Sequence, residues 1–423
     1  MSEIVPGVRL TCVNAERFKT GCLAVTLVGP LSRDAAAASA LLPRVLRRGS
    51  AEYPDMESLS AALDGLYGSR VEPTVRKKGE LHCIGLYADF PDDRYIPGQE
   101  SILERTAALM GGVLLSPVTE GGLLLADYVE SEKNNLVDDI RAAINDKRGY
   151  SIDRLIEEMC AGEAYGVGKL GSEDAARAIT PGSLTAHYHS LLENSRIEAF
   201  YCGSAAPEQV AAALRPALQG LPERGAVPSP GTRVILYPET GAPRRFTESL
   251  DVTQGKLTVG FRLGKAMKEP DYPALMVFNS VYGGSITSKL FLNVRERLSL
   301  CYYASSMIEK HKGIMVVSSG VEFANFEAAL EEMFAQLGNV KSGDVSDWEL
   351  TSAKRYLITS IKAAMDSPGG LEELYFDKAV AAVPYDPAEL SEQIEAVTLD
   401  RVVDTAAEID PDSIFLLKGQ QPD

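Results

Sequence analysis

The order of the predicted secondary structure elements in the first half of this chain occurs again in the second half. Each half is expected to begin with two apolar strands, to continue with helices, a hairpin and longer helices, and to include a late strand. In the first half the elements are expected at residues 7–13, 18–29, 34–39, 56–66, 70–76, 81–90, 101–115, 123–145, 152–159, 180–192, 196–202 and 207–218. In the second half they are expected at residues 233–237, 256–262, 272–282, 286–297, 301–308, 313–321, 323–337, 347–365 and 413–418. The repeated order predicts a duplicated α+β unit, with each copy a mainly antiparallel sheet covered by helices on one face.

A polar segment rich in proline and glycine lies between the two sets of elements. It covers residues 221–231 and is the most linker-like stretch of the sequence. A chain of 423 residues also suits two domains of about 200 residues each better than one core. We therefore expect an N-terminal domain at residues 1–220, a linker at 221–231 and a C-terminal domain at 232–423.

The charge and the cysteines limit the possible partners and compartment. The chain has 42 Lys and Arg against 59 Asp and Glu, a net charge of −17. Such an acidic surface argues against nonspecific binding to nucleic acid or to anionic membranes. The six cysteines are scattered without a C-x-x-C pair, which suits reduced thiols better than disulfides or a zinc knuckle. With no basic, apolar leader at its start and no apolar run of about 18 residues, the protein is expected to be soluble and cytoplasmic.

A short run after the alanine-rich helix carries the first functional signal. Residues 40–50 read A-L-L-P-R-V-L-R-R-G-S. This layout resembles the signature helix of pitrilysin/insulinase-type zinc peptidases, in which H-x-x-E-H is followed by a spacer and a Gly-Thr pair. The resemblance places Ala40 and Arg44 at the two histidines and Pro43 at the general-base glutamate. Because proline removes a helical hydrogen bond at a cost of about 3 kcal/mol, we expect the helix to kink or restart near Leu42. An ordinary surface helix containing a proline is the alternative.

Three further motifs extend the resemblance over nearly the whole chain. Residues 283–291 read G-G-S-I-T-S-K-L-F and residues 294–302 read V-R-E-R-L-S-L-C-Y, similar to a pair of motifs in pitrilysin-family C-terminal domains. Residues 132–140, E-K-N-N-L-V-D-D-I, resemble the helix that carries the family's third zinc ligand. The resemblance puts that ligand at Asp139 and a supporting glutamate at Glu132. It implies a pitrilysin/insulinase-like fold, related to the mitochondrial processing peptidases, that lacks the zinc motif.

One branch of this family is especially similar. Residues 18–20, 40–43, 63–68, 77–79 and 146–150 resemble the metal-free YfmF-type bacterial paralogues. The resemblance implies an active, H-x-x-E-H-bearing paralogue as partner in a heterodimer, with a homodimer as the alternative. It also implies a possible link to modification of elongation factor P.

No replacement metal site is apparent, so no cofactor is expected. Catalytic zinc takes three protein ligands and structural zinc four. The chain has four histidines, and His187 and His189 would point about 200° apart on one helix. His82 is interpreted as a surface strand residue.

Arg295 and Tyr302 match a family pair that reaches toward the active site and polarises the scissile carbonyl. A solvated arginine and a packed tyrosine without a catalytic role are the alternative. Without a metal in the same chain we expect no catalysis by this pair, which remains a candidate for binding peptide or serving a partner's site.

Three classes of function are therefore open. The favoured class is a noncatalytic partner subunit that supplies the peptide-binding half of a peptidase-type complex. The others are a stand-alone peptide- or protein-binding module that uses a sheet edge, and a metallopeptidase with an unrecognised site.

Arg44 also suggests what replaces the metal. An arginine near vacated carboxylates can bind one of them bidentately. We expect Arg44 to pair with Asp139, with Glu132 and Asp138 as alternative partners, and to hold the two helices at their spacing. The alternative is that Arg44 points to solvent beside Arg47 and Arg48.

Overall fold

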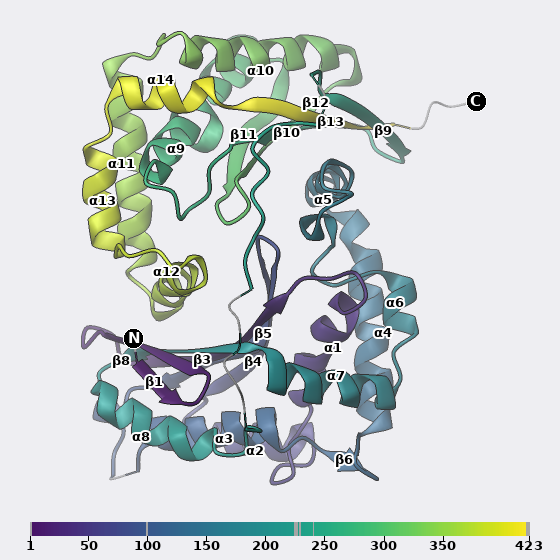
Figure 1. Ribbon diagram of the computed structural model, residues 1–423, viewed down its shortest axis with the longest axis vertical. Coiled ribbons are helices and arrows are strands. Elements are labelled where there is room, and N and C mark those ends of the chain that lie inside the picture. The colour runs from purple at the N-terminus through teal and green to yellow at the C-terminus, as the bar shows by residue number, and fades with distance from the viewer. Residues whose placement is uncertain (1, 99, 224–226, 228–229, 240, 420–423) are drawn as a thin grey trace. The chain divides into compact units, whose positions relative to one another are not determined.

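The computed structural model describes residues 2–98, 100–223, 227, 230–239 and 241–419. The chain forms two compact units (Figure 1). Unit 1 contains Met1–Arg141, Val167–Gly231 and Ala364–Val380, and unit 2 contains the remaining segments, Ala142–Gly166, Thr232–Ala363 and Ala381–Asp423. Each unit has one main sheet with helices, which confirms the predicted α+β fold. The domain boundaries at residues 220 and 232 stay a prediction, and part of the expected linker, residues 224–226 and 228–229, lies outside the described residues.

Unit 1 is built on a six-stranded sheet in the order β1-β2-β8-β3-β5-β4. The strands are β1 (Ser2–Val5), β2 (Val8–Asn14), β3 (Thr20–Pro30), β4 (Arg70–Lys78), β5 (Leu81–Pro91) and β8 (Arg196–Gly203). Neighbours pair antiparallel except β2 and β8, which are parallel. β3 has a run of small and branched apolar residues and is buried along nearly its whole length, as expected for a strand covered on both faces. β4 is an edge strand of this sheet.

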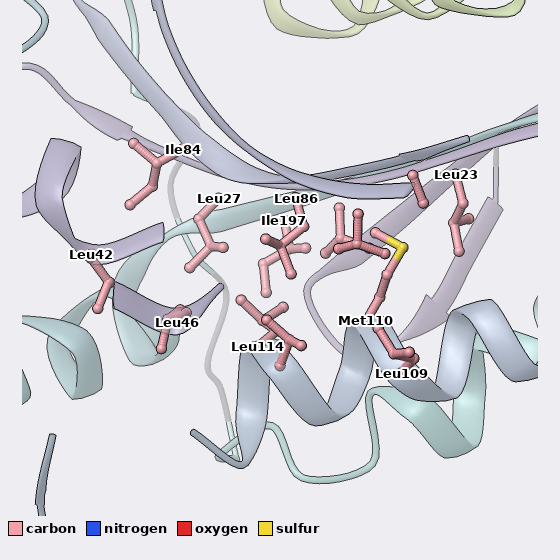
Figure 2. Packing of buried hydrophobic residues seen from close by; sticks show 14 of the residues in the cluster. Leu23, Leu27, Leu42, Leu46, Ile84, Leu86, Leu109, Met110, Leu114 and Ile197 are labelled. Atoms are coloured by element: carbon pink, nitrogen blue, oxygen red, sulfur yellow. The ribbon is translucent and has the colours of Figure 1, made fainter. Parts of the chain in front are cut away.

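One face of this sheet packs against helices from the first half of the chain. They are α1 (Ala36–Leu46), α2 (Met56–Asp64), α3 (Ile102–Leu115), α4 (Ala126–Ala142), α6 (Glu173–Arg177), α7 (Pro181–Asn194) and α8 (Pro207–Ala217). Figure 2 shows the resulting core, in which Leu23, Leu27 and Leu86 from the strands meet Leu46 of α1 and Leu114 of α3. Two short strands, β6 (Thr119–Glu120) and β7 (Leu123–Leu124), precede α4. The helix expected from residue 123 therefore begins three residues later.

The expected restart of α1 near Leu42 does not occur, whereas the alternative of a kink stays a prediction. The helix runs without interruption from Ala36 to Leu46, with Pro43 inside it. Most of its residues are buried, among them Leu41 and Leu42 at 0 and 2 % exposure. This tertiary burial offsets the backbone hydrogen bond that the proline removes.

Unit 2 is built on a five-stranded sheet in the order β11-β12-β10-β13-β9. The strands are β9 (Arg244–Leu250), β10 (Gly255–Arg262), β11 (Cys301–Glu309), β12 (Ile314–Val321) and β13 (Asp410–Gly419), and only β9 and β13 pair parallel. The helices of this part of the chain are α9 (Tyr272–Asn279), α10 (Phe326–Lys341), α11 (Asp347–Ala364), α13 (Pro387–Glu395) and α14 (Leu399–Ala407). Residues 280–284 and 290–297 form π-helical turns where regular helix was expected.

One predicted strand of unit 2 is wrong. Residues 233–237 form no strand, and the fifth strand is β9, which lies at a sheet edge. β9 reads R-R-F-T-E-S-L and alternates between half-buried and exposed residues. It was missed because a polar edge strand lacks the apolar run that marks a buried one.

Each unit also contains a helix from the opposite half of the sequence. In unit 1, α12 (Pro368–Ala381) lies on the side of the sheet opposite α3 and α8 (Figure 1). Its Leu371 packs with Cys22 and Phe200, and its Phe376 packs with Val28. The second face of β3 is thereby removed from water, which explains why the strand is apolar at successive positions.

Buried ion pairs fasten α12 to this sheet. Arg76 of β4 donates two hydrogen bonds to Glu372, at 2.7 and 2.8 Å, and the Lys78 ammonium lies 2.9 Å from Asp377. The Glu372 and Asp377 side chains are only 5 and 1 % exposed. Because isolated buried charges are strongly unfavourable, these pairs fix which residues of the helix meet the strands.

Unit 2 receives α5 (Lys147–Met159) from the first half of the chain. Leu155 and Met159 pack against Val316 and Phe415 of the sheet. Beyond the helix, Glu163 lies 2.6 Å from the nitrogens of both Arg262 and Lys312. Burial alone would raise the pKa of Glu163, but hydrogen bonds from these two cations outweigh it and hold the pKa below its ordinary value. In both units, therefore, the segment that comes from the opposite half of the sequence forms ion pairs with the residues around the sheet that it joins.

The ion pairs of α12 predict unequal effects for two neighbouring glutamates. Glu372→Ala should lower the free energy of unfolding by about 3 kcal/mol, because it leaves the Arg76 guanidinium without its main buried partner. Glu373 also contacts Arg76, but its side chain is 46 % exposed, so Glu373→Ala should cost less than about 1 kcal/mol. Chemical denaturation followed by circular dichroism measures both, and equal losses would contradict the assignment.

Candidate functional site

The candidate site of unit 1 is formed where α1 lies near α4. Because α1 is continuous, Ala40 and Arg44 lie one turn apart on one side of the helix. Ala40 is fully buried, whereas the Arg44 side chain is 23 % exposed. The two positions that the resemblance matches to the histidines therefore share one face of a helix, and neither side chain is a metal ligand.

Arg44 forms the ion pair expected from the sequence. Its Nη1 donates to Oδ2 of Asp139 on α4 at 2.7 Å. The alternative in which Arg44 points to solvent is wrong. Asp139 is itself 54 % exposed, so this pair is solvent-screened on the carboxylate side, and Asp138 is exposed without contacting Arg44.

The other two arginines near α1 also have partners, which the sequence analysis missed. Arg48 Nη1 lies 3.0 Å from Glu132 Oε1, and its guanidinium stacks 5.0 Å from the ring centroid of Tyr128. Arg47 donates through Nε to the carbonyl of Val71 on β4. Arg48 belongs to no motif, and its pairing with Glu132 arises only through the fold.

The arginines open onto a pocket of about 630 Å³ within unit 1. This volume lies in the range of small-molecule and peptide side-chain sites. Its lining consists of basic and acidic side chains with a few apolar ones: Arg44, Arg47, Arg48, Met56, Glu72, Pro73, Val75, Glu132, Asn135, Lys169 and Leu170. Asp139, the partner of Arg44, is not part of the lining.

Arg295 and Tyr302 lie together in unit 2. Both line a pocket of about 480 Å³. Arg295 is 3.5 Å from the adjacent Glu296 and stacks 4.7 Å from the ring of Phe291. Tyr302 is 59 % exposed and its hydroxyl donates to Glu322 at 3.2 Å. The interpretation of Tyr302 as a packed residue is therefore wrong, and both side chains are accessible on this unit.

Comparison with known proteins identifies the family. The chain is 34 % identical over 421 residues to a Bacillus subtilis (strain 168) protein described as "Probable inactive metalloprotease YmfF", covering 98 % of this chain and 96 % of the relative. It belongs to the M16 peptidase family. A family model described as "Peptidase M16 inactive domain" matches residues 178–357. The description of this relative as a probable inactive metalloprotease agrees with the expected inactive bacterial branch of the family.

Solved structures share the fold of this chain. A conserved protein from Enterococcus faecalis V583 has a TM-score of 0.90 at 26 % identity and covers 100 % of this chain and 99 % of its own. A peptidase M16 inactive domain from Pseudomonas fluorescens has the same fold, with a TM-score of 0.80 at 17 % identity, and 98 % of each chain is covered. The match in both cases extends over both halves of the sequence.

The residues at the M16 signature positions do not fit a zinc ion. Ala40 and Pro43 offer no donor atom, and Arg44 brings a positive charge that would repel the metal. Across the parts of the chain that the structure describes, no three His, Cys, Asp or Glu side chains come together in a way that could hold a metal. No helix in those parts combines the length and the apolar character needed to cross a bilayer.

Two histidines of unit 1 are shielded from solvent to different degrees, His82 being buried and His187 half-buried. His82 on β5 is 5 % exposed, so its interpretation as a surface strand residue is wrong. His187 on α7 lies 2.9 Å from the Ser39 hydroxyl of α1, whereas His189 is exposed. Burial lowers the pKa of His82 to about 4, although a backbone hydrogen bond at Lys169 acts in the opposite direction.

The two ion pairs between α1 and α4 predict different losses of stability. Arg48→Ala should lower the free energy of unfolding by about 2 kcal/mol, because Glu132 is 13 % exposed and would lose its charged donor. Arg44→Ala should cost less than about 1 kcal/mol, because the more exposed Asp139 can be solvated instead. Urea denaturation distinguishes them. A larger loss for Arg44→Ala would mean that Arg44 is the main link between the helices.

His82 predicts a loss of stability in mild acid. Its pKa falls from 6.5 to about 4 on folding, so the folded state favours the neutral ring. This contribution is fully present above pH 6.5 and is lost as the pH falls toward 4, by up to about 3 kcal/mol. His82→Gln should flatten the dependence of unfolding free energy on pH in this window. His189→Gln is the control and should leave the dependence intact.

Proposed function

We propose that this chain is a noncatalytic M16-family subunit that provides the peptide-binding half of a peptidase-type complex. The observation that carries the proposal is the substitution of side chains at the signature helix. The scaffold of α1 and α4 is retained, but the ligand and base positions hold Ala40, Pro43 and Arg44, and Arg44 is bound to Asp139. Such a site binds neither zinc nor an activated water through these residues, so cleavage requires a second protein.

An active paralogue carrying the H-x-x-E-H motif is the proposed partner, in a cytoplasmic heterodimer. The support is the resemblance to the YfmF-type branch and the similarity to a relative whose name calls it inactive. The proposed link to elongation factor P modification rests on the same resemblance. A homodimer is the alternative assembly.

Arg295 and Tyr302 are the proposed contacts to peptide or to the partner's site. Both are accessible on unit 2 and line one pocket. A guanidinium and a phenol can donate hydrogen bonds to a peptide carbonyl. Neither residue is assigned a catalytic role in this chain.

A stand-alone peptide-binding module is the second candidate. One feature favours it: β4 is an edge strand beside the unit 1 pocket, and an extended peptide can add to such an edge. This module would bind peptide without any partner. A metallopeptidase with an unrecognised site is the third candidate and would require bound metal.

The assembly is tested by native mass spectrometry after co-expression with an H-x-x-E-H-bearing paralogue from the same organism. We expect a one-to-one complex, because the proposed function requires a catalytic partner. Co-expression with an unrelated monomeric protein is the control. A chain that stays monomeric or pairs only with itself would rule out the partner role.

Metal content provides an independent prediction. The purified chain should contain no stoichiometric zinc, because three protein ligands are the minimum for a catalytic site. Elemental analysis of the chain alone measures this, with the H-x-x-E-H-bearing paralogue as the positive control. Zinc near one equivalent per chain, with chelator-sensitive cleavage of unstructured peptides, would establish the third candidate instead.

A further inference from the structure

The pocket of unit 1 is basic, although the chain as a whole is strongly acidic. Four cationic side chains line it, Arg44, Arg47, Arg48 and Lys169, against two carboxylates. The net charge of the whole chain is −17. The charge of this cavity is thus opposite in sign to the net charge of the chain. The low-dielectric walls of a pocket strengthen the electric field of the charges that line it.

Two of these cations are not neutralised by a carboxylate. The Lys169 side chain is exposed and has no ion pair within the described ranges of the chain. Arg47 donates to the carbonyl of Val71 and to the sulfur of Met56, neither of which carries a charge. By contrast, the charges of Arg44 and Arg48 are balanced by Asp139 and Glu132.

The two carboxylates of the lining, Glu132 and Glu72, also differ in whether a cation is paired with them. Glu132 accepts hydrogen bonds from Arg48 and from the side-chain amide of Asn135. Glu72, on the edge strand β4, is exposed, and its carboxylate opposes the charge of Arg47 and Lys169. The lining therefore remains net positive, and Glu72 is the group that limits its attraction for an anion.

We infer that this pocket, which Arg44 and Glu132 of the degenerate site line together with Arg47 and Lys169, binds the carboxylate of an acidic side chain in a peptide. The inference rests on the proposed peptide-binding function and adds the chemical class of ligand. Lys169 and Arg47 supply charged donors, and the pocket of about 630 Å³ has room for an acidic side chain with its neighbouring backbone. The acidic surface opposes a long polyanion such as nucleic acid, which needs an extended basic track.

The test compares two labelled peptides by fluorescence anisotropy. They share one unstructured sequence, in which the glutamates of the first are replaced by glutamines in the second. The full-length chain, alone and in complex with its paralogue, should bind the glutamate peptide about fivefold more tightly at low salt. The difference should shrink as salt is raised.

Two variants change the pocket charge in opposite directions. Lys169→Glu should weaken binding of the glutamate peptide about tenfold, because it removes one attraction and adds one repulsion. Glu72→Gln should strengthen it about threefold, a gain that a misfolded protein could not produce. Neither change should alter binding of the glutamine peptide. Lys19→Glu is the matched control, because Lys19 is an exposed lysine of unit 1 outside the pocket lining.

The possible outcomes separate this inference from the proposed function. Equal binding of both peptides, unchanged by the two variants, would overturn the acidic preference and leave peptide binding intact. If neither peptide binds while the heterodimer forms, both the inference and the peptide-binding role fail, and only the partner role survives. A loss with Lys19→Glu as large as with Lys169→Glu would assign the effect to overall charge and would also overturn the inference.

Discussion

Buried ion pairs between segments from opposite halves of the sequence are the constraint on which both units depend. Glu372 and Asp377 of α12 meet Arg76 and Lys78 inside unit 1, and Glu163 meets two cations inside unit 2. A buried charge without its partner costs several kcal/mol. Arg262 also has a partner in its own half, Asp412, but Glu372, Asp377 and Glu163 meet the cations named here only when the two halves of the chain fold together.

The same exchange accounts for the hydrophobic pattern of β3. A strand covered on one face would alternate between apolar and polar residues, but β3 is apolar at successive positions because α12 covers its second face. The local sequence of β3 therefore carries information about a helix more than 300 residues away in the chain (Cys22 to Leu371). The duplicated fold is in this sense one interdependent structure built from two similar sheets.

Much of this fold could be predicted from the sequence, because most strands and long helices follow a clear periodicity. β10, the β11–β12 hairpin and α11 are examples with long apolar or amphipathic runs. The helix exchange could not be predicted, because periodicity shows that a face is buried but not which segment buries it. The restart of α1 near Pro43 was predicted for a related reason. Proline does lower the local stability of a helix, but the burial of α1 by the rest of unit 1 outweighs that loss.

The ion pair between Arg44 and Asp139 could be predicted from the sequence. The other residues that line the neighbouring pocket could not. Family motifs placed Arg44 near Asp139, and complementary charge gave the expected contact. Arg48 and Lys169 were missed because they belong to no motif and come together only through the fold.

The chemistry of the pocket depends on the arginines that line it. A zinc ion binds several ligands at once and draws their carboxylate and imidazole groups inward. An arginine satisfies one carboxylate at a time, as Arg44 does with Asp139 and Arg48 with Glu132. These pairs can hold α1 near α4 without filling the space that ligands and metal would share. Charged side chains are also strongly solvated, which disfavours collapse of the walls onto one another. The two ion pairs therefore leave a pocket with more cationic than anionic side chains in its lining, which is the arrangement behind the proposed anion site.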